Sequence, residues 1–232
     1  MLGRRKRVYG SRGRSKSAPV KRAKKTTPRW TKLKSKTTNA IAQTIRTTHT
    51  YYEYATINPV VAQAGVYVFA ANGLYDPNIT GVGHQPAGFD QITQLYHEYL
   101  VVGSTIRITY TNADTNNCVN AGVFLCDYST TSSDYRRYVE SGNGKWTQCG
   151  RLGESDYIKT LTHSADMAKF SNQDIKNEDN FAGSAASNPA DTHYYHVVVW
   201  PSDGISDNGD VLINVEINYD VIWRDPALLE VS

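Results

Sequence analysis

The sequence predicts an all-β fold: a single eight-stranded jelly-roll sandwich with one short helix and a disordered basic N-terminal arm. Three observations lead to this prediction. Apolar and polar residues alternate over several short segments, Gly, Pro, Asn and Asp separate these segments, and only one stretch has helical spacing. About 195 residues follow the arm, which is enough to bury one core and more than the roughly 100 residues of an immunoglobulin-like sandwich.

The N-terminal segment differs in charge from the rest of the chain. Residues 1–36 contain fifteen Lys and Arg and no carboxylate, and the first acidic residue is Glu53. Residues 37–232 contain the other ten basic residues and all 22 acidic ones, a net charge of −12 within an overall charge of +3. Mutual repulsion and few apolar side chains predict that residues 1–36 form a disordered arm. Its expected partner is a polyanion, because each phosphate that Lys or Arg neutralises releases condensed counterions.

One part of the arm is typical of a nuclear-localisation cluster. Pro19–Lys25 reads PVKRAKK, and its candidate residues are Lys21, Arg22, Lys24 and Lys25. Short basic runs also occur in arms that only bind nucleic acid, so both interpretations stay open. A mitochondrial transit peptide is disfavoured, because Pro19, Pro28 and several glycines interrupt any amphipathic helix. We expect neither a membrane span nor a secretory signal, since no segment has the apolar length of either.

The folded part is predicted to span residues 51–232, after a Thr-rich connector at residues 37–50. Six segments have strand character: YYEYATI (51–57), GVYVFAA (65–71), STIRITY (104–110), AGVFLCD (121–127), YHVVVW (195–200) and VLINVEINYDVIW (211–223). The last is the clearest, because its apolar residues from Val211 to Trp223 occupy every second position. Two weaker segments, KWTQCGRL (145–152) and DYIKTLTH (156–163), bring the total to eight, the number of strands in a jelly roll.

The single helical signal is GFDQITQLYHEYL, residues 88–100. Asp90 can cap a helix there, and the apolar residues fall at three- and four-residue spacing: Phe89, Ile92, Leu95, Tyr96 and Tyr99. Two long loops, residues 129–144 and 171–191, complete the pattern. Loops of this length in an all-β domain predict contacts with other molecules.

No arrangement of catalytic or metal-binding residues is recognisable, so we expect no enzyme activity, no cofactor and no metal site. His193 and His196 lie three residues apart in a predicted strand and therefore point to opposite faces. Asp203, Asp207 and Asp210 lack the alternating ligands of a calcium loop and are expected to form a turn before the last strand.

The residues from Gly73 to Asn112 read GLYDPNITGVGHQPAGFDQITQLYHEYLVVGSTIRITYTN. GHQP followed by GFDQ, then YHEY and a strand of the form V-x-GS-x-I, resembles the signature region of capsid proteins from circular Rep-encoding single-stranded DNA viruses, the circovirus-like group. The basic arm and the ending WRDP of the last strand agree with this resemblance. It is close over about 40 residues and covers the rest of the chain only in overall plan. The arm differs from the most familiar circoviral arms, because Lys and Ser interrupt its arginines.

The resemblance implies a coat protein whose single jelly roll assembles, in about sixty copies, into an icosahedral T=1 shell. It also implies packaging of circular single-stranded DNA by the arm, nuclear import, and a location in the virion and, during assembly, in the host nucleus. Host nuclear import receptors and a host-cell surface receptor or glycan are further implied partners. The nucleic-acid-binding residues would be Arg4, Arg5, Lys6, Arg7, Arg12, Arg14, Lys16, Lys21, Arg22, Lys24, Lys25, Arg29, Lys32, Lys34 and Lys36, with Trp30 stacking on bases.

Two other classes of function stay open at this stage. A nucleic-acid-binding β-barrel with a basic tail, such as a single-strand-binding or ribosomal protein, would carry basic and aromatic residues on its folded domain. Only ten Lys and Arg lie there. An enzyme such as a jelly-roll cupin would need clustered histidines and a carboxylate on neighbouring strands, whereas the six histidines here are scattered.

Overall fold

The computed structural model describes residues 41–79 and 83–228, so the predicted arm at residues 1–36 lies outside the described residues. The described strands are β1 (Ile45–Ile57), β2 (Gly65–Ala70), β3 (Tyr96–Asn112), β4 (Val119–Cys126), β5 (Gly144–Cys149), β6 (Ile158–Asp166), β7 (Ala182–Ser184), β8 (Tyr194–Pro201) and β9 (Val211–Pro226). The helices are short: α1 (Phe89–Thr93), α2 (Arg136–Ser141), α3 (Met167–Ser171) and the 3-10 turn η1 (Asp179–Phe181). None of these described helices has the length and apolar character needed to cross a membrane.

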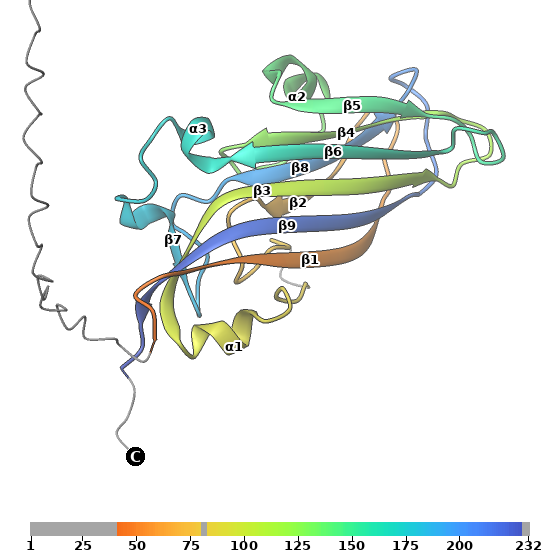
Figure 1. Ribbon diagram of the computed structural model, residues 1–232. Coiled ribbons are helices and arrows are strands. Elements are labelled where there is room, and N and C mark those ends of the chain that lie inside the picture. The colour runs from red at the N-terminus through yellow and green to blue at the C-terminus, as the bar shows by residue number, and fades with distance from the viewer. Residues whose placement is uncertain (1–40, 80–82, 229–232) are drawn as a thin grey trace, which may run out of the picture. The chain divides into compact units, whose positions relative to one another are not determined.

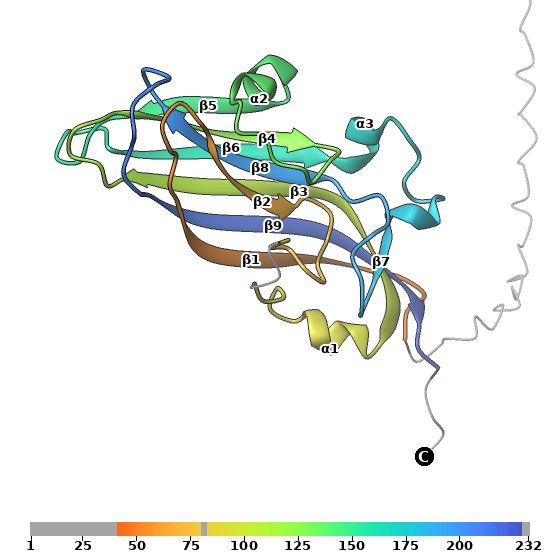
Figure 2. The same ribbon diagram turned by 180° about the vertical axis from the view of Figure 1, so that it is seen from behind.

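The strands form two packed sheets (Figures 1 and 2). The first sheet has the order β1-β9-β3-β6, with β7 pairing separately with β3, and the second has the order β2-β8-β4-β5. Every pairing is antiparallel. With β7 set aside, the first strand pairs with the last, the second with the second-last, and so on inward to β4 and β5. This nested pairing, alternating between two sheets, is the eight-stranded jelly roll that the sequence predicts.

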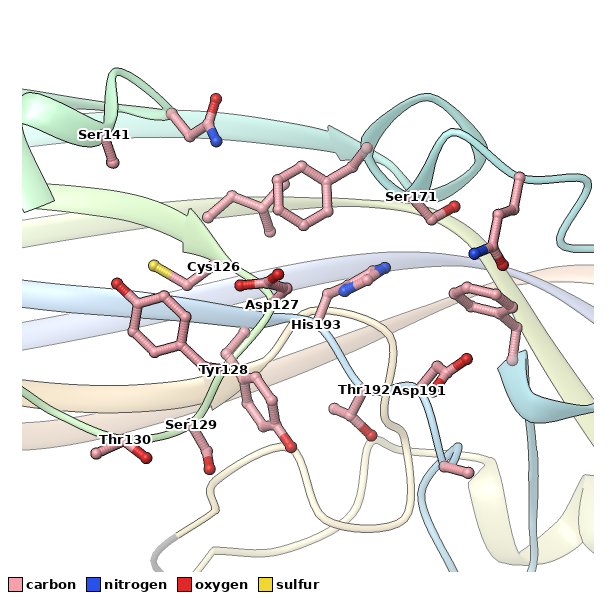
Figure 3. Close-up of a pocket in the computed structure, with 17 residues that line it drawn as sticks. Cys126, Asp127, Tyr128, Ser129, Thr130, Ser141, Ser171, Asp191, Thr192 and His193 are labelled. Carbon is pink, nitrogen blue, oxygen red and sulfur yellow. The ribbon is translucent and has the colours of Figure 1, made fainter.

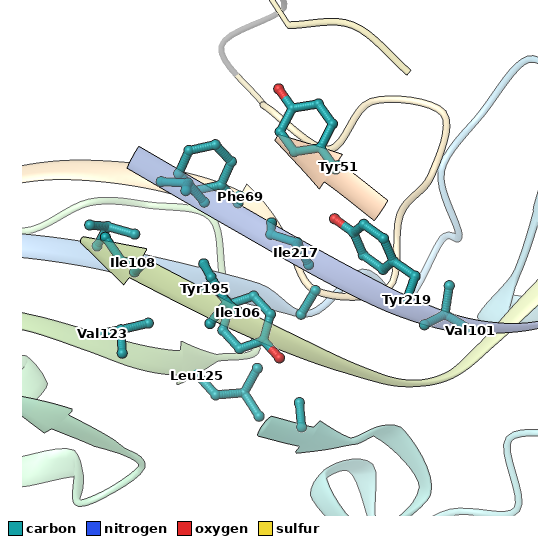
Figure 4. Close-up of a cluster of buried hydrophobic side chains, with 14 of the residues drawn as sticks. Tyr51, Phe69, Val101, Ile106, Ile108, Val123, Leu125, Tyr195, Ile217 and Tyr219 are labelled. Atoms are coloured by element: carbon teal, nitrogen blue, oxygen red, sulfur yellow. The ribbon is translucent and has the colours of Figure 1, made fainter. Parts of the chain in front are cut away.

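Strand β9 shows how the sequence produces this architecture. Its residues alternate strictly between fully buried and partly exposed from Val211 to Trp223, as the period-2 pattern predicts. It lies between β1 and β3, so both edges of its backbone are hydrogen-bonded. Its buried face supplies the middle of the core, where Ile217 and Tyr219 meet Ile106 and Val101 of β3 and Tyr195 of the second sheet (Figure 4).

Buried tyrosines connect the two sheets through their hydroxyl groups. Tyr219 of β9 donates to the carbonyl oxygen of Ala70 in β2 at 2.8 Å, and Tyr110 of β3 donates to that of Gly122 in β4 at 2.8 Å. In the opposite direction, Tyr195 of β8 donates to the carbonyl oxygen of Ser104 at 3.1 Å. Burial raises the pKa of all three tyrosine side chains, so they remain neutral donors at physiological pH.

The first strand starts earlier than the sequence indicates. We predicted a connector at residues 37–50 and a domain from residue 51, but β1 begins at Ile45 and pairs with β9 from there onward. The Thr residues that suggested a connector are β-branched and suit a strand. Thr48 and Thr50 point away from the core on this segment, whereas Thr47 lies on the same face as the buried His49 and Tyr51 and accepts a hydrogen bond from Trp223 at 2.8 Å.

The helical prediction over residues 88–100 is correct only for its first part. Helix α1 ends at Thr93, and the residues from Tyr96 onward belong to β3. Tyr96 and Tyr99 have helical spacing relative to Phe89, but pairing with β9 on one side and β7 on the other holds them in a strand. The prediction of one short helix also misses α2 and α3, which lie at residues 136–141 and 167–171.

The inter-sheet hydrogen bonds give a stability prediction. Tyr219→Phe leaves the Ala70 carbonyl without this partner inside the core, and we expect it to lower the free energy of unfolding by about 1–3 kcal/mol in urea denaturation. The matched control is Tyr52→Phe, because Tyr52 is 55% exposed and donates to Asn214 at the surface. The control should change the unfolding free energy by less than about 0.5 kcal/mol. Equal effects of the two substitutions would contradict the role assigned to Tyr219.

Candidate functional site

The predicted nucleic-acid-binding residues, from Arg4 to Lys36 and including Trp30, all lie outside the described residues. Their structural role therefore stays a prediction. What the structure does describe is the folded domain that would carry them. Its charged groups, loops and exposed apolar side chains indicate which functions the domain itself can perform.

Half of the basic side chains on the domain are paired with carboxylates. The pairs are Arg46 with Asp220, Arg136 with Asp134, Arg151 with Glu154, Lys159 with Asp156, and Arg224 with both Glu98 and Asp179. These contacts lie at the surface, so each contributes little to stability. Their consequence is electrostatic, because a cation beside a carboxylate is poorly placed to bind a phosphate.

Two more cations are occupied in other ways. The Arg137 guanidinium lies 4.6 Å from the ring centre of Tyr128, and Lys145 donates to the carbonyl oxygen of Thr162 at 2.8 Å. Among the described residues this leaves Arg107, Lys169 and Lys176 without an ion pair. The domain therefore offers few free cations to a nucleic-acid backbone.

Four loops meet at one end of the sandwich, which we call the loop end. It consists of the β1–β2, β3–β4, β5–β6 and β8–β9 connections, at the right of Figure 1. Asp114 connects these loops: its carboxylate accepts from the backbone N–H of Asn116 and Asn117 at 2.7 and 3.1 Å and from that of Gly209 at 2.9 Å. These hydrogen bonds lower the pKa of Asp114 against the opposing effect of burial.

Further hydrogen bonds join the same loops. The backbone N–H of Leu152 donates to the carbonyl oxygen of Asp114 at 2.7 Å, and the Asn58 amide donates to Asp210 at 3.0 Å. Asp203 accepts from the backbone N–H of Ile205 at 3.0 Å, which confirms that this acidic segment forms a turn. The loop end is therefore a set of mutually braced turns.

The loop end also exposes aliphatic side chains. The exposed fractions are 49% and 57% for Val60 and Val61, 43% for Leu152 and 68% for Ile205. Single exposed apolar residues are ordinary, but four at the same end of the sandwich make this end a candidate for contact with another protein. No sequence pattern predicts this role for them. Their only local signal is the presence of Val and Ile within turn segments rich in Pro, Gly, Asn and Asp.

The residues that carry the family resemblance pack against one another near α1. Phe89, Tyr99 and Trp223 form a triangle of rings with centres 5.7–5.8 Å apart, and His49 lies edge-on to Trp223 at 5.6 Å. The Tyr99 hydroxyl accepts from the backbone N–H of Leu74 at 3.0 Å. These residues from the 73–112 segment and the last strand therefore fix the long β2–β3 connection onto the first sheet.

The histidines of HYYH do not converge. His196 lies in β8, where its ring nitrogens face Tyr138 and the carbonyl oxygen of Tyr128, at 3.4 and 2.8 Å. His193 precedes β8 and packs against Phe170 and Phe181. Within residues 41–79 and 83–228, no three or more His, Cys, Asp or Glu side chains group closely enough to hold a metal ion.

No protein-family model matches the chain, and no curated protein matches it. Several solved structures are similar to it. They include a Desmodium yellow mottle tymovirus chain (11% identity, 81% of this chain and 93% of that chain, TM-score 0.41) and a semi-empty virus-like particle of the Macrobrachium rosenbergii nodavirus (8%, 83% and 100%, 0.47). A third is the decameric BFDV capsid protein (11%, 78% and 99%, 0.38). The assignment of the jelly roll rests on the strand order described above.

Buried histidines give a pH prediction. Burial lowers the pKa of His49, His163, His193 and His196 in the folded chain. The unfolded chain, with histidine pKa values near about 6.5, therefore binds protons first as pH falls. Stability is fully present above about pH 6.5 and declines below it. We expect a smaller urea-unfolding free energy at about pH 5.5 than at about pH 7.5.

A matched pair of variants assigns this effect to buried groups. His196→Gln keeps a polar group near the Tyr128 carbonyl and should remove part of the pH dependence, whereas His97→Gln, at an exposed position of β3, should not. Stability that stays constant or rises between the two pH values would contradict the assignment.

Proposed function

We propose that this chain is a viral coat protein of the circovirus-like type, which self-assembles into an icosahedral shell and packages circular single-stranded DNA through its basic N-terminal arm. One observation carries the proposal: the chain segregates its charge. Fifteen Lys and Arg without a carboxylate lie in residues 1–36, while most basic side chains of the folded domain are already occupied by carboxylates, a ring or a carbonyl.

The charge of the arm agrees with the size of a small genome. About sixty arms with fifteen charges each supply roughly 900 positive charges, against one negative charge per nucleotide. A genome of roughly one to two thousand nucleotides would be about half neutralised, and small cations would balance the rest. The acidic surface of the domain would keep the packaged polymer on the arm and away from the faces that contact other copies.

The loop end supports the assembly part of the proposal. Its braced turns expose the side chains of Val60, Val61, Leu152 and Ile205. Burying such side chains between copies of the domain would contribute the hydrophobic term that closed assemblies need. A coat protein of this kind has no catalytic step. The arm would also carry the import signal at Lys21, Arg22, Lys24 and Lys25, which accounts for assembly in the host nucleus.

A nucleic-acid-binding β-barrel outside a shell is the alternative. In such a protein the folded domain binds the polymer itself, with basic and aromatic side chains on one face. The paired cations of this domain argue against that function. Exposed Tyr52 and Tyr54 on β1 are its best support.

The role of the arm predicts a specific salt dependence. For a single-stranded oligonucleotide, we expect a plot of the logarithm of affinity against the logarithm of salt concentration to be linear. Its slope should be about −0.7 for each phosphate that the arm neutralises. Replacing Lys21, Arg22, Lys24 and Lys25 together by Gln should make this slope shallower by about 3, measured by filter binding. A chain with the residues of its arm shuffled keeps the charge and should bind as the natural chain does. Loss of binding on shuffling would contradict binding that depends on charge and not on residue order. A slope unchanged by the four substitutions would show that these residues do not neutralise phosphates.

The role of the loop end predicts an assembly defect. The double variant Val61→Glu/Ile205→Glu places two charges on the proposed contact surface and should leave small oligomers in light scattering. Both positions are exposed, so far-UV circular dichroism should remain that of the folded domain. The matched control, Val61→Ile/Ile205→Val, keeps the surface apolar and should assemble normally. Full-size particles formed by the Glu variant would rule out this surface as an essential contact.

A further inference from the structure

A pocket of about 880 Å³ lies at the end of the sandwich opposite the loop end. Three parts of the chain form its walls: the residues that follow β4, the end of α2 with Asn143, and α3 together with the segment that leads into β8. The described residues that line it include no Lys or Arg, although the Arg137 guanidinium lies 4.6 Å from the ring centre of the lining residue Tyr128. The polar lining consists of carboxylates, amides, hydroxyl groups, the Cys126 thiol and one imidazole, so the lining itself is rich in hydrogen-bond acceptors.

Two carboxylates of the pocket have no partner within the described residues. Asp127 and Asp191 are exposed and form no ion pair or side-chain hydrogen bond there, unlike the carboxylates that pair with the cations of the domain. Both lie close enough to His193 to act electrostatically on its imidazole. Figure 3 shows Asp127 on one side of the ring and Asp191 on the other.

His193 is the unusual group of this pocket. The residue is 7% exposed, and neither ring nitrogen has a hydrogen-bond partner among the described residues. Its backbone is fixed, because its N–H donates to the Asn72 amide oxygen at 2.8 Å and its carbonyl oxygen accepts from the N–H of Ala71 at 2.7 Å. The ring itself packs against the rings of Phe170 and Phe181, with ring centres 4.9 and 5.8 Å away. Buried polar groups without partners are costly and rare, which points to a ligand group beside this ring.

The chemistry of the lining selects the ligand. Phosphate, sulfate and carboxylate ligands are disfavoured, because two carboxylates line the pocket and Arg137, the cation beside it, lies against the Tyr128 ring. The described residues provide no three-ligand group for a metal ion. A protonated amine suits both the two carboxylates and the unpartnered imidazole of His193, since an ammonium N–H donates to carboxylates and to a neutral imidazole alike. The rings of Phe170 and Phe181 beside His193 add apolar surface for a short carbon chain.

We propose that this pocket binds an alkylammonium group, with Asp127 and Asp191 holding the ammonium and His193 accepting a hydrogen bond from it at the base. Two sources carry this chemistry: a free aliphatic diamine or polyamine, and a lysine side chain of the arm, from this chain or another copy. The inference does not depend on the proposed coat function. In a packaged particle such an amine would also be one of the small cations that balance the genome.

The test is calorimetric titration of putrescine into the full-length protein, freed of nucleic acid by nuclease and checked by absorbance at 260 nm. We expect saturable binding at low ionic strength. Asp127→Asn/Asp191→Asn should weaken it by at least about tenfold, which corresponds to about 1.4 kcal/mol. The matched control is Asp90→Asn/Asp207→Asn, which changes the net charge equally at two exposed positions outside the pocket and should stay within about twofold.

Two results would overturn the proposal. Equal weakening by both double variants would show general attraction to an acidic domain. Equal binding of 1,4-butanediol, which has hydroxyl groups in place of the amines, would show a site for polyols.

A final comparison identifies the source of the amine. The complete jelly roll lies within residues 45–226, so a chain of residues 37–232 retains every described strand. Tighter putrescine binding by this chain would show that lysines of the arm compete for the pocket. Unchanged binding would identify a free amine as the ligand. Both results support an ammonium site, whereas loss of binding in the shortened chain would contradict a site built by the domain alone.

Discussion

The structure depends on the antiparallel pairing of β9 with both β1 and β3. Because β9 is the last strand, the first sheet is incomplete until the whole domain has been made, and its long-range contacts favour slow folding. The same strand supplies Tyr219, which reaches the second sheet, and Trp223, which anchors the β2–β3 connection. Asp210, the residue directly before β9, accepts a hydrogen bond from the Asn58 amide and so belongs to the braced turns of the loop end. Strand β9 therefore contributes to the core, to the contact between the two sheets and to both ends of the sandwich.

This arrangement separates the tasks of the chain. The described strands bury their apolar residues between the two sheets, and half of the basic side chains of the domain pair with its own carboxylates. Most of the positive charge of the chain therefore lies in residues 1–36, and the loop end exposes four aliphatic side chains. The opposite end has a polar pocket, where two carboxylates without an ion pair among residues 41–79 and 83–228 lie around a buried histidine. Polyanion binding, self-contact and amine binding would thus occupy different parts of one molecule.

The sequence predicts the fold well because the strands of the jelly roll can be identified from patterns of neighbouring residues. Period-2 alternation identifies β9, and the number and spacing of strand segments with the domain size select the architecture. The same signals fail where tertiary pairing decides. YHEY has helical spacing but joins β3, because β9 and β7 pair with it. The segment AGS has no pattern of its own and is a strand only because β3 extends past β6.

The candidate sites were less predictable for a physical reason. Asp114 accepts from Gly209, which lies 95 residues further along the chain, and no local motif encodes that contact. The pocket likewise joins residues near 127, 143, 171 and 191. Charge, in contrast, is visible in composition alone, so the excess of Lys and Arg in residues 1–36 is evident from the sequence, and the role of this segment stays a prediction.

The most direct test of this account is light scattering on a sizing column, with absorbance at 260 and 280 nm recorded together, for the full-length chain and for residues 37–232. The account predicts megadalton particles for both, with excess absorbance at 260 nm only when the arm is present. Monomers or small oligomers in both forms, across a range of salt concentrations and pH values, would contradict shell assembly.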